Sequence, residues 1–263
     1  MSHRFFNVRH LAAIAASLSL GSAAHAAQIN LTITAENLAP TNSISFAPLH
    51  FGIHNGSFDA FNIGQVATAP IISVAEGGSG VAWQAAFALA DPGATRGTIG
   101  MPLFPGQNRS LTVMVDTAVN TYFTFASMVI PSNDFFIGND SPTRFSLLNP
   151  DGSLKITSII QKASQIWDAG SEVLDPAAAA FVGDNGLRAP QNSVVAFNFG
   201  EFAAYNGLTT AAGYTFNSAL SAGTDVYSIS FSAAPIPEPE VYALMVSGLM
   251  LIGAIARRRR GKA

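Results

Sequence analysis

Apolar and polar residues alternate along several short stretches of the chain. Between Gln28 and Asn37 nearly every second residue is apolar, as expected for a strand with one buried face. Residues 109–119, 121–130 and 226–232 have the same strand character. Gly and Pro turns separate such stretches at roughly 8–12-residue intervals, which is typical of an antiparallel β-sandwich or barrel. The pattern therefore predicts an all-β fold.

Other stretches give a weaker signal. Residues 44–53 have the pattern of a strand, but Pro48 interrupts it and indicates an edge or a bulge. Residues 157–164 fit a short helix or a strand, residues 176–181 fit a short helix or a loop, and residues 190–202 have strand character. No long segment with a 3.6-residue period stands out, which argues against an α/β fold.

One domain spanning residues 27–233 is the simplest division of the chain. No internal repeat interrupts this span. Phe occurs 19 times and Trp only twice, a composition that suits a core packed between two sheets.

The N-terminal residues 1–26 have the layout of a secretory signal peptide. Arg4 and Arg9 make the beginning basic, and residues 11–20 form an apolar run too short to span a bilayer. Ala24 and Ala26 then supply the small residues that an export peptidase reads. These features predict export through the inner membrane.

The C-terminal residues 234–263 contain three parts in order. Pro237, Glu238 and Pro239 come first, then the apolar run 241–256, and then Arg257, Arg258, Arg259 and Arg260. A helix of this run would be roughly 24 Å long at ~1.5 Å per residue, somewhat short of a ~30 Å hydrocarbon core. Flanking arginines can extend past the hydrocarbon, so a single transmembrane helix is expected, with the arginines cytoplasmic.

This tail resembles the PEP-CTERM sorting signal of Gram-negative bacteria in order, spacing and terminal arginines. The resemblance implies cleavage near the Pro-Glu-Pro motif by an exosortase-type membrane protease. It also implies that the body is held at the inner membrane before processing. Afterwards the body would reach the cell surface or the exopolysaccharide matrix, where exopolysaccharide or surface proteins are the expected partners.

The remaining body is acidic and lacks cysteine. Residues 27–235 hold six Lys or Arg and fourteen Asp or Glu, a net charge of −8, whereas the whole chain has −3. A body with so few basic residues argues against nucleic acid as a partner, because phosphate binding needs clustered Lys and Arg. The absence of cysteine excludes disulfides, zinc–thiolate sites and thiol nucleophiles.

Two turns hold the most suggestive carboxylates. Asp134 follows an apolar strand and Pro131, and Asp168 and Glu172 stand in a second turn roughly thirty residues further on. Calcium prefers six to eight oxygen ligands, several of them carboxylates, so these three residues would suit a calcium site if the turns meet. Alternatively, they are solvated turn residues whose side chains cap nearby backbone amides.

Three strings in the body resemble the spondin domain of F-spondin-type extracellular proteins: FASMVIPSND at residues 125–134, WDAG at 167–170, and HNGSFD at 54–59, a segment found in bacterial relatives. The resemblance implies an eight-stranded antiparallel sandwich similar to C2 domains, with calcium at one end. The matching acidic ligands are Asp134, Asp168 and Glu172. Two positions depart from the animal proteins: Glu172 stands where aspartate is usual, and Asn133-Asp134-Phe135 replaces an Asp-Trp pairing.

Catalytic motifs are lacking. His50 and His54 share one face of a predicted strand, yet no third metal ligand lies nearby in sequence. There is no Gly-x-Ser-x-Gly, no His-Glu-x-x-His and no phosphate-binding loop. Asp168 and Glu172 could flank a glycosidic bond, but nothing assigns one as acid and the other as base.

Two functions follow. The first is a non-enzymatic, calcium-binding and adhesive surface module. The alternative is a carbohydrate-binding or weakly glycan-hydrolysing extracellular protein.

Overall fold

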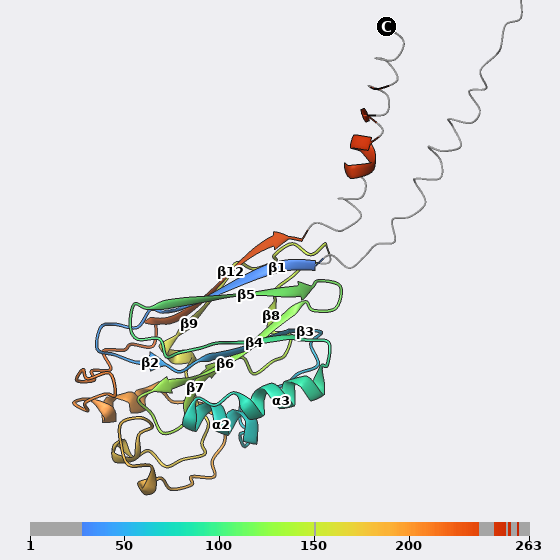
Figure 1. Ribbon diagram of the computed structural model, residues 1–263. Coiled ribbons are helices and arrows are strands. Elements are labelled where there is room, and N and C mark those ends of the chain that lie inside the picture. Colours follow the sequence, from blue (N-terminus) through green and yellow to red (C-terminus); the bar gives the residue numbers. More distant parts are fainter. Residues whose placement is uncertain (1–27, 150, 237–244, 251, 254–256, 258–263) are drawn as a thin grey trace, which may run out of the picture.

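The computed structural model describes residues 28–149, 151–236, 245–250, 252–253 and 257. Between residues 28 and 235 the chain forms two antiparallel sheets that pack face to face, and two helices cover the outer face of the larger sheet (Figure 1). The predicted all-β sandwich is confirmed in this coarse form. The helical layer was not predicted.

The smaller sheet has the strand order β5-β1-β12-β9. Its strands are β5 (Asn108–Asp116), β1 (Gln28–Asn37), β12 (Asp225–Pro235) and β9 (Ser158–Lys162). The alternation predicted for β1 is present: Ile29, Leu31, Ile33 and Ala35 are buried. On its other face, Thr32 Oγ1 lies 2.7 Å from Thr112 Oγ1 of β5, so hydroxyl groups pair across the exposed side of the sheet.

The larger sheet follows the order β11-β10-β7-β6-β3-β4. These strands are β11 (Ala196–Phe197), β10 (Trp167–Asp168), β7 (Phe135–Gly138), β6 (Tyr122–Ile130), β3 (Leu49–His54) and β4 (Thr95–Ile99). Two further short strands, β2 (Ser45–Phe46) and β8 (Phe145–Ser146), also pair with β6. Of the twelve strands in the described residues, eight have four residues or more.

The two sheets enclose the main hydrophobic core. Aromatic side chains join the layers: Phe123 of β6 meets Phe231 of β12 with ring centroids 4.9 Å apart, and Phe46 of β2 lies 4.5 Å from Tyr227 of β12. Side chains such as these bury much apolar area each and account for much of the folding free energy.

The central strands β3 and β6 are buried along almost their whole length, not only at alternate positions. Such strands need cover on both faces. Helices α2 (Ala69–Gly77) and α3 (Val81–Ala90) supply it on the outer side, where Trp83 and Phe87 of α3 enter a second core. The two helices are short and rich in Ala and apolar residues, so the sequence shows no clear 3.6-residue period.

Other expectations need correction. Pro48 does separate two strands, β2 and β3, yet β3 is an interior strand because it pairs with both β4 and β6. The predicted strand at 190–202 is only β11, followed by the 3-10 helix η4 (Phe199–Tyr205).

The two ambiguous segments are also assigned. Residues 157–164 contain β9 and then η1 (Ala163–Gln165). Residues 176–181 begin with η2 (Pro176–Ala178). A further 3-10 turn, η3 (Asn185–Leu187), follows.

The expectations for the two chain ends lie mostly outside the described residues. This holds for the signal peptide with Ala24 and Ala26, for the motif at 237–239, and for most of the run 241–256 and of the arginine cluster. Within the described part of the chain, no helix is both long and apolar enough to cross a membrane.

Gly52 of β3 tests the packing of α3 on the larger sheet. A Cβ atom at Gly52 would lie 2.2 Å from Cζ of Phe87, so Gly52→Ala should lower the free energy of unfolding by about 1–3 kcal/mol through overpacking. Gly77→Ala is the control, because no atom lies within 4 Å of its added Cβ. Its effect should stay within about 1 kcal/mol. Urea denaturation measures the free energy of unfolding of each variant. Equal values for Gly52→Ala and the wild type would contradict the packing described.

Candidate functional site

Asp134 lies in the turn between β6 and β7. Ser132 shapes this turn: its Oγ donates to the carbonyl oxygen of Val129 at 2.6 Å and accepts from the amide of Phe135 at 3.1 Å. The peptide between Ile130 and Pro131 is cis. This local bonding holds the Asp134 side chain in a buried position, only 3% exposed.

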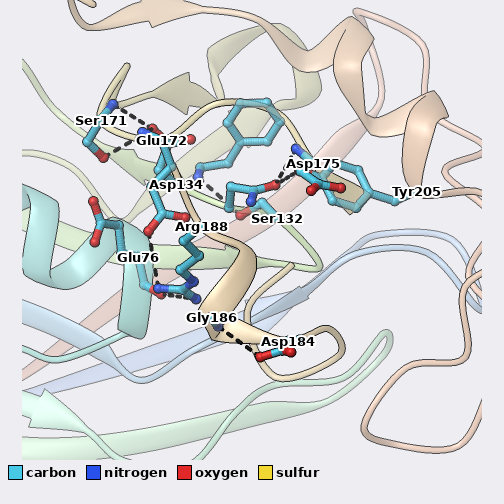
Figure 2. A network of polar contacts seen from close by, with 12 residues as sticks. Glu76, Ser132, Asp134, Ser171, Glu172, Asp175, Asp184, Gly186, Arg188 and Tyr205 are labelled. Atoms are coloured by element: carbon cyan, nitrogen blue, oxygen red, sulfur yellow. Dashed lines mark hydrogen bonds and ion pairs between the residues drawn. The ribbon is translucent and has the colours of Figure 1, made fainter. Parts of the chain in front are cut away.

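The Asp134 carboxylate binds the backbone of the second predicted turn. Its Oδ2 accepts hydrogen bonds from the amide of Ser171 at 2.7 Å, from the hydroxyl of Ser171 at 3.1 Å and from the amide of Glu172 at 2.9 Å (Figure 2). The carbonyl oxygen of Asp134 also accepts from the amide of Ala169 at 3.1 Å. The two turns that the sequence singled out therefore meet.

Asp168 lies on β10, which pairs with β7 so that Asp168 is opposite Phe135. Its Oδ1 accepts from the amide of Gly170 at 2.6 Å, and its Oδ2 is 3.5 Å from Nδ2 of Asn198. Asn198 Nδ2 also donates to Oε1 of Glu201, at the start of η4. A third chain segment thus brings an amide and a carboxylate to the site.

The Glu172 carboxylate lies among further charges besides that of Asp134. Its Oε1 lies 3.3 Å from Nη1 of Arg188, and its Oε2 is buried without a hydrogen-bond partner among the described residues. Arg188 Nη2 donates to the carbonyl oxygen of Glu76 in α2 at 3.2 Å. In Figure 2 the Glu172 side chain points toward Arg188, with Glu76 beside the pair. Arg188 therefore places a positive charge beside the Glu172 carboxylate.

The carboxylates at this end of the sheet are difficult to ionise. Burial, together with the charge of Asp168, raises the pKa of Asp134 to about 6, against the opposing effect of its hydrogen bonds from Glu172 and Ser171. Burial also raises the pKa of Asp168. For Glu201, burial and the nearby Asp168 raise the pKa as well. Negative charge is thus concentrated where solvation is poor.

The pKa of Glu172 is also raised, for partly different reasons. Burial raises its pKa to about 7, the charges of Glu76 and Asp134 add to the effect, and the charge of Arg188 opposes it. The ion pair with Arg188 does not fully offset the desolvation of the carboxylate.

Tyr205 connects η4 to the Asp134 turn. Its hydroxyl donates to Oδ1 of Asn133 at 2.6 Å, and burial raises the pKa of this hydroxyl. The segment that carries Glu201 is therefore tied to the turn that carries Asp134 by a buried hydrogen bond.

The sequence predicts Asp134, Asp168 and Glu172 as site residues, but it does not predict that Asn198, Glu201, Glu76 and Arg188 lie beside them. These four residues lie in stretches without a recognisable motif, and only the fold brings them to the site. Asn198 and Glu201 lie inside the stretch 190–202 that the sequence predicts as a strand, so the sequence carries no local signal for them.

The donor set is suited in kind to a hard cation. Carboxylate and amide oxygens are the ligands that calcium prefers. Among the described residues, however, no three His, Cys, Asp or Glu side chains are grouped as a metal site. Of the three predicted carboxylates, Asp134 and Asp168 remain the candidates for such a site, because Glu172 forms an ion pair with Arg188.

The two histidines of β3 have structural surroundings. His54 Nδ1 accepts from the amide of Gly56 at 3.1 Å, so its Nε2 carries the proton and donates to Thr124 Oγ1 at 2.9 Å. His50 bonds to Thr98 and to the carbonyl oxygen of Gly78. Burial lowers the pKa of His54 to about 4 despite the nearby Asp91. Both rings thus belong to the packing beneath the helices.

Comparison with known proteins adds no family. No protein-family model matches the chain, and no curated protein matches it either.

The raised pKa of Asp134 gives a pH-dependent stability that can be measured. Because the folded-state pKa, about 6, exceeds the ordinary value of 3.8, Asp134 stabilises the fold most below pH 4, and this contribution is lost as the pH rises to 6. The free energy of unfolding of the wild type, relative to that of Asp134→Asn, should therefore fall by about 2–3 kcal/mol between pH 4 and pH 7 in chelator.

Urea denaturation across this pH range measures the free energy of unfolding of both proteins. Because the pKa of His54 is lowered, its titration changes stability with pH in the opposite direction, but this change is common to both proteins and cancels in the difference. Asp59→Asn, which removes an exposed carboxylate, is the control and should show no such trend. A pH-independent difference for Asp134→Asn would contradict the burial described.

Proposed function

We propose that this protein is an exported, non-enzymatic module of the spondin type that acts at the cell surface or in the extracellular matrix and binds calcium. The observation that carries the proposal is the meeting of Asp134 and Asp168 from separate turns in a poorly solvated place. A bound cation would remove the electrostatic cost of keeping these carboxylates ionised there.

Two carboxylate oxygens support calcium as the cation. Asp134 Oδ1 forms no hydrogen bond with a described residue, and Asp168 Oδ2 has only the long contact with Asn198. Calcium accepts carbonyl and water oxygens beside carboxylates, so two aspartates can be enough when other oxygens complete the shell. Glu201 brings a further carboxylate to the same hydrogen-bonded group, because Glu201 and Asp168 both contact Nδ2 of Asn198.

We place Glu201, and not Glu172, as the further carboxylate that lies beside the two aspartates of this site. The resemblance to spondin domains points to Glu172, but its ion pair with Arg188 places a positive charge beside it, which disfavours a second cation. Glu201 shares Asn198 with Asp168, and its pKa responds to the charge of Asp168.

The module would act by presenting calcium-stabilised loops for adhesion. The three segments that meet at the site contain mostly turns and 3-10 helices, so calcium would fix loops that few backbone ladders hold. Extracellular calcium modules bind with dissociation constants of about 10⁻⁴–10⁻³ M, which suits a protein exposed to millimolar calcium.

The chain ends support the location. The signal-like N-terminus and the tail with Pro237, Glu238 and Pro239 favour export and processing by an exosortase-type protease, with surface proteins or exopolysaccharide as later partners. The net charge of −8 between residues 27 and 235 argues against nucleic acid.

Calcium should raise the thermal stability of the protein. A ligand that binds only the folded state stabilises by roughly 2.7 kcal/mol at one hundred times its dissociation constant, so the unfolding temperature should rise by several degrees. Asp134→Asn and Asp168→Asn should abolish the rise, and Glu201→Gln should reduce it more than Glu172→Gln. Asp59→Asn should leave it intact. The absence of a rise for the wild type at roughly 10–100 mM calcium, one hundred times the dissociation constants expected above, would contradict the calcium proposal.

Processing of the tail can be tested in the cells that make the protein. Glu238→Ala should leave the chain membrane-bound with its C-terminal epitope intact, whereas the wild type should lose the epitope and reach the surface or medium. Glu240→Ala is a matched control, since this carboxylate stands just outside the Pro-Glu-Pro motif. Immunoblots of cell fractions distinguish the two, and identical processing of all three chains would contradict the sorting proposal.

A further inference from the structure

A pocket of about 360 Å³ opens beside β10 and β11, and the site described above makes no use of it. Aromatic and polar side chains line it together, among them Trp167, Phe197, Phe145, Arg144, Asp140 and Gln165. Its volume lies at the small end of the range for ligand pockets, about 300–1,000 Å³. It therefore suits a ligand of one or two rings.

The aromatic wall of the pocket is rigid and partly open. The rings of Phe197 and Trp167 stack with centroids 3.7 Å apart and planes 24° from parallel, and Phe197 stays 46% exposed. Trp167 is fixed from behind, because its Nε1 donates to the carbonyl oxygen of Gly138 and its ring meets Phe61 edge to face. An exposed aromatic ring held in this way loses little conformational entropy on binding.

The polar side chains of the pocket have free hydrogen-bonding capacity. Neither Arg144 nor Asp140 forms an ion pair or a side-chain hydrogen bond with another described residue, and the guanidinium of Arg144 lies 6.0 Å from the Phe145 ring centroid. Gln165 uses its Oε1 to accept from the amide of Lys162 at 2.9 Å, which leaves its Nε2 as a donor. The pocket thus offers donors and an acceptor beside an apolar wall.

We propose that this pocket binds a neutral pyranose unit of a polysaccharide. A pyranose ring has an apolar C–H face, which would pack on Phe197, and an edge of hydroxyls, each both donor and acceptor, which would bond to Arg144, Asp140 and Gln165. Asp140 and Arg144 bring one negative and one positive charge to the pocket, so the pair is neutral and the overall acidity of the body disfavours a uronate or sulfated sugar. The ligand class is therefore a neutral hexose or disaccharide.

The proposal is separate from the calcium site. Trp167 and Asp168 are neighbours on β10, and successive side chains of a strand point to opposite faces of its sheet. Trp167 contributes to the core beneath the helices, whereas Asp168 bonds on the side of Asn198. No residue used here is one of the assigned calcium ligands.

Tryptophan fluorescence gives a direct readout of binding. The chain has two tryptophans, and Trp83 is fully buried in α3, so a change on adding sugar reports on Trp167. The purified protein would be titrated with glucose, galactose, mannose, their disaccharides and glucuronate, in calcium and in chelator. We expect saturable binding of at least one neutral sugar in the millimolar range or tighter.

Variants make the test specific. Phe197→Ala and Arg144→Ala should each weaken binding roughly tenfold or more, since the first removes the aromatic wall and the second removes a main hydrogen-bond donor. Phe181→Ala is the matched control, because Phe181 is 55% exposed and lies outside this pocket. Thermal melts of each variant show whether it is folded, and retention of the calcium-induced rise in Phe197→Ala separates this pocket from the calcium site.

Three results would overturn the proposal. One is the absence of a fluorescence or calorimetric response to every neutral sugar at tens of millimolar. Another is wild-type affinity in folded Phe197→Ala and Arg144→Ala. The third is binding of glucuronate without binding of any neutral sugar.

Discussion

Burial of β3 and β6 on both faces is the constraint on which the rest of the structure depends. A sheet interior of this kind cannot face water on either side, so it needs two covering layers. The smaller sheet covers one face, and the helices α2 and α3 cover the other. Gly52 lets the Phe87 ring approach the β3 backbone, which a larger residue would prevent.

The same constraint governs the polar groups inside the sheet. His54 lies in β3 beneath the helices, where a charged imidazolium would be poorly solvated. It stays neutral, and both of its nitrogens are bonded, one as acceptor and one as donor. Such a histidine stabilises the covering layer and has no lone pair free for a metal.

At the end of β6 a buried carboxylate fixes a neighbouring turn. Asp134 Oδ2 accepts three hydrogen bonds from residues 171 and 172, in a turn whose only β-pairing among the described residues is an isolated bridge between Glu172 and Pro190. Charge-assisted bonds of this type are roughly twice as strong as neutral ones. Their cost is a buried negative charge next to Asp168, and this combination is the basis of the proposed calcium site.

The sequence predicts the strands that have one buried face far better than the elements that have two. β1 shows its alternation plainly, because one side contacts the core and the other contacts water. The segments of α2 and α3 are apolar around most of their circumference and only 9 and 10 residues long, so their period is hidden. The stretch 190–202 is also misleading, since most of its residues contact loops and not a strand.

The candidate site, too, could be predicted from the sequence only in part. Asp134 and Asp168 could be paired from sequence because each stands in a predicted turn and the strings around them resemble the spondin domain. The sequence could not predict that Glu172 meets Arg188 or that Glu201 lies near Asp168. These contacts join segments 16 and 33 residues apart in sequence, through loops without a regular period. Charge balance thus decides which carboxylates remain available to a ligand, and only the folded chain sets that balance.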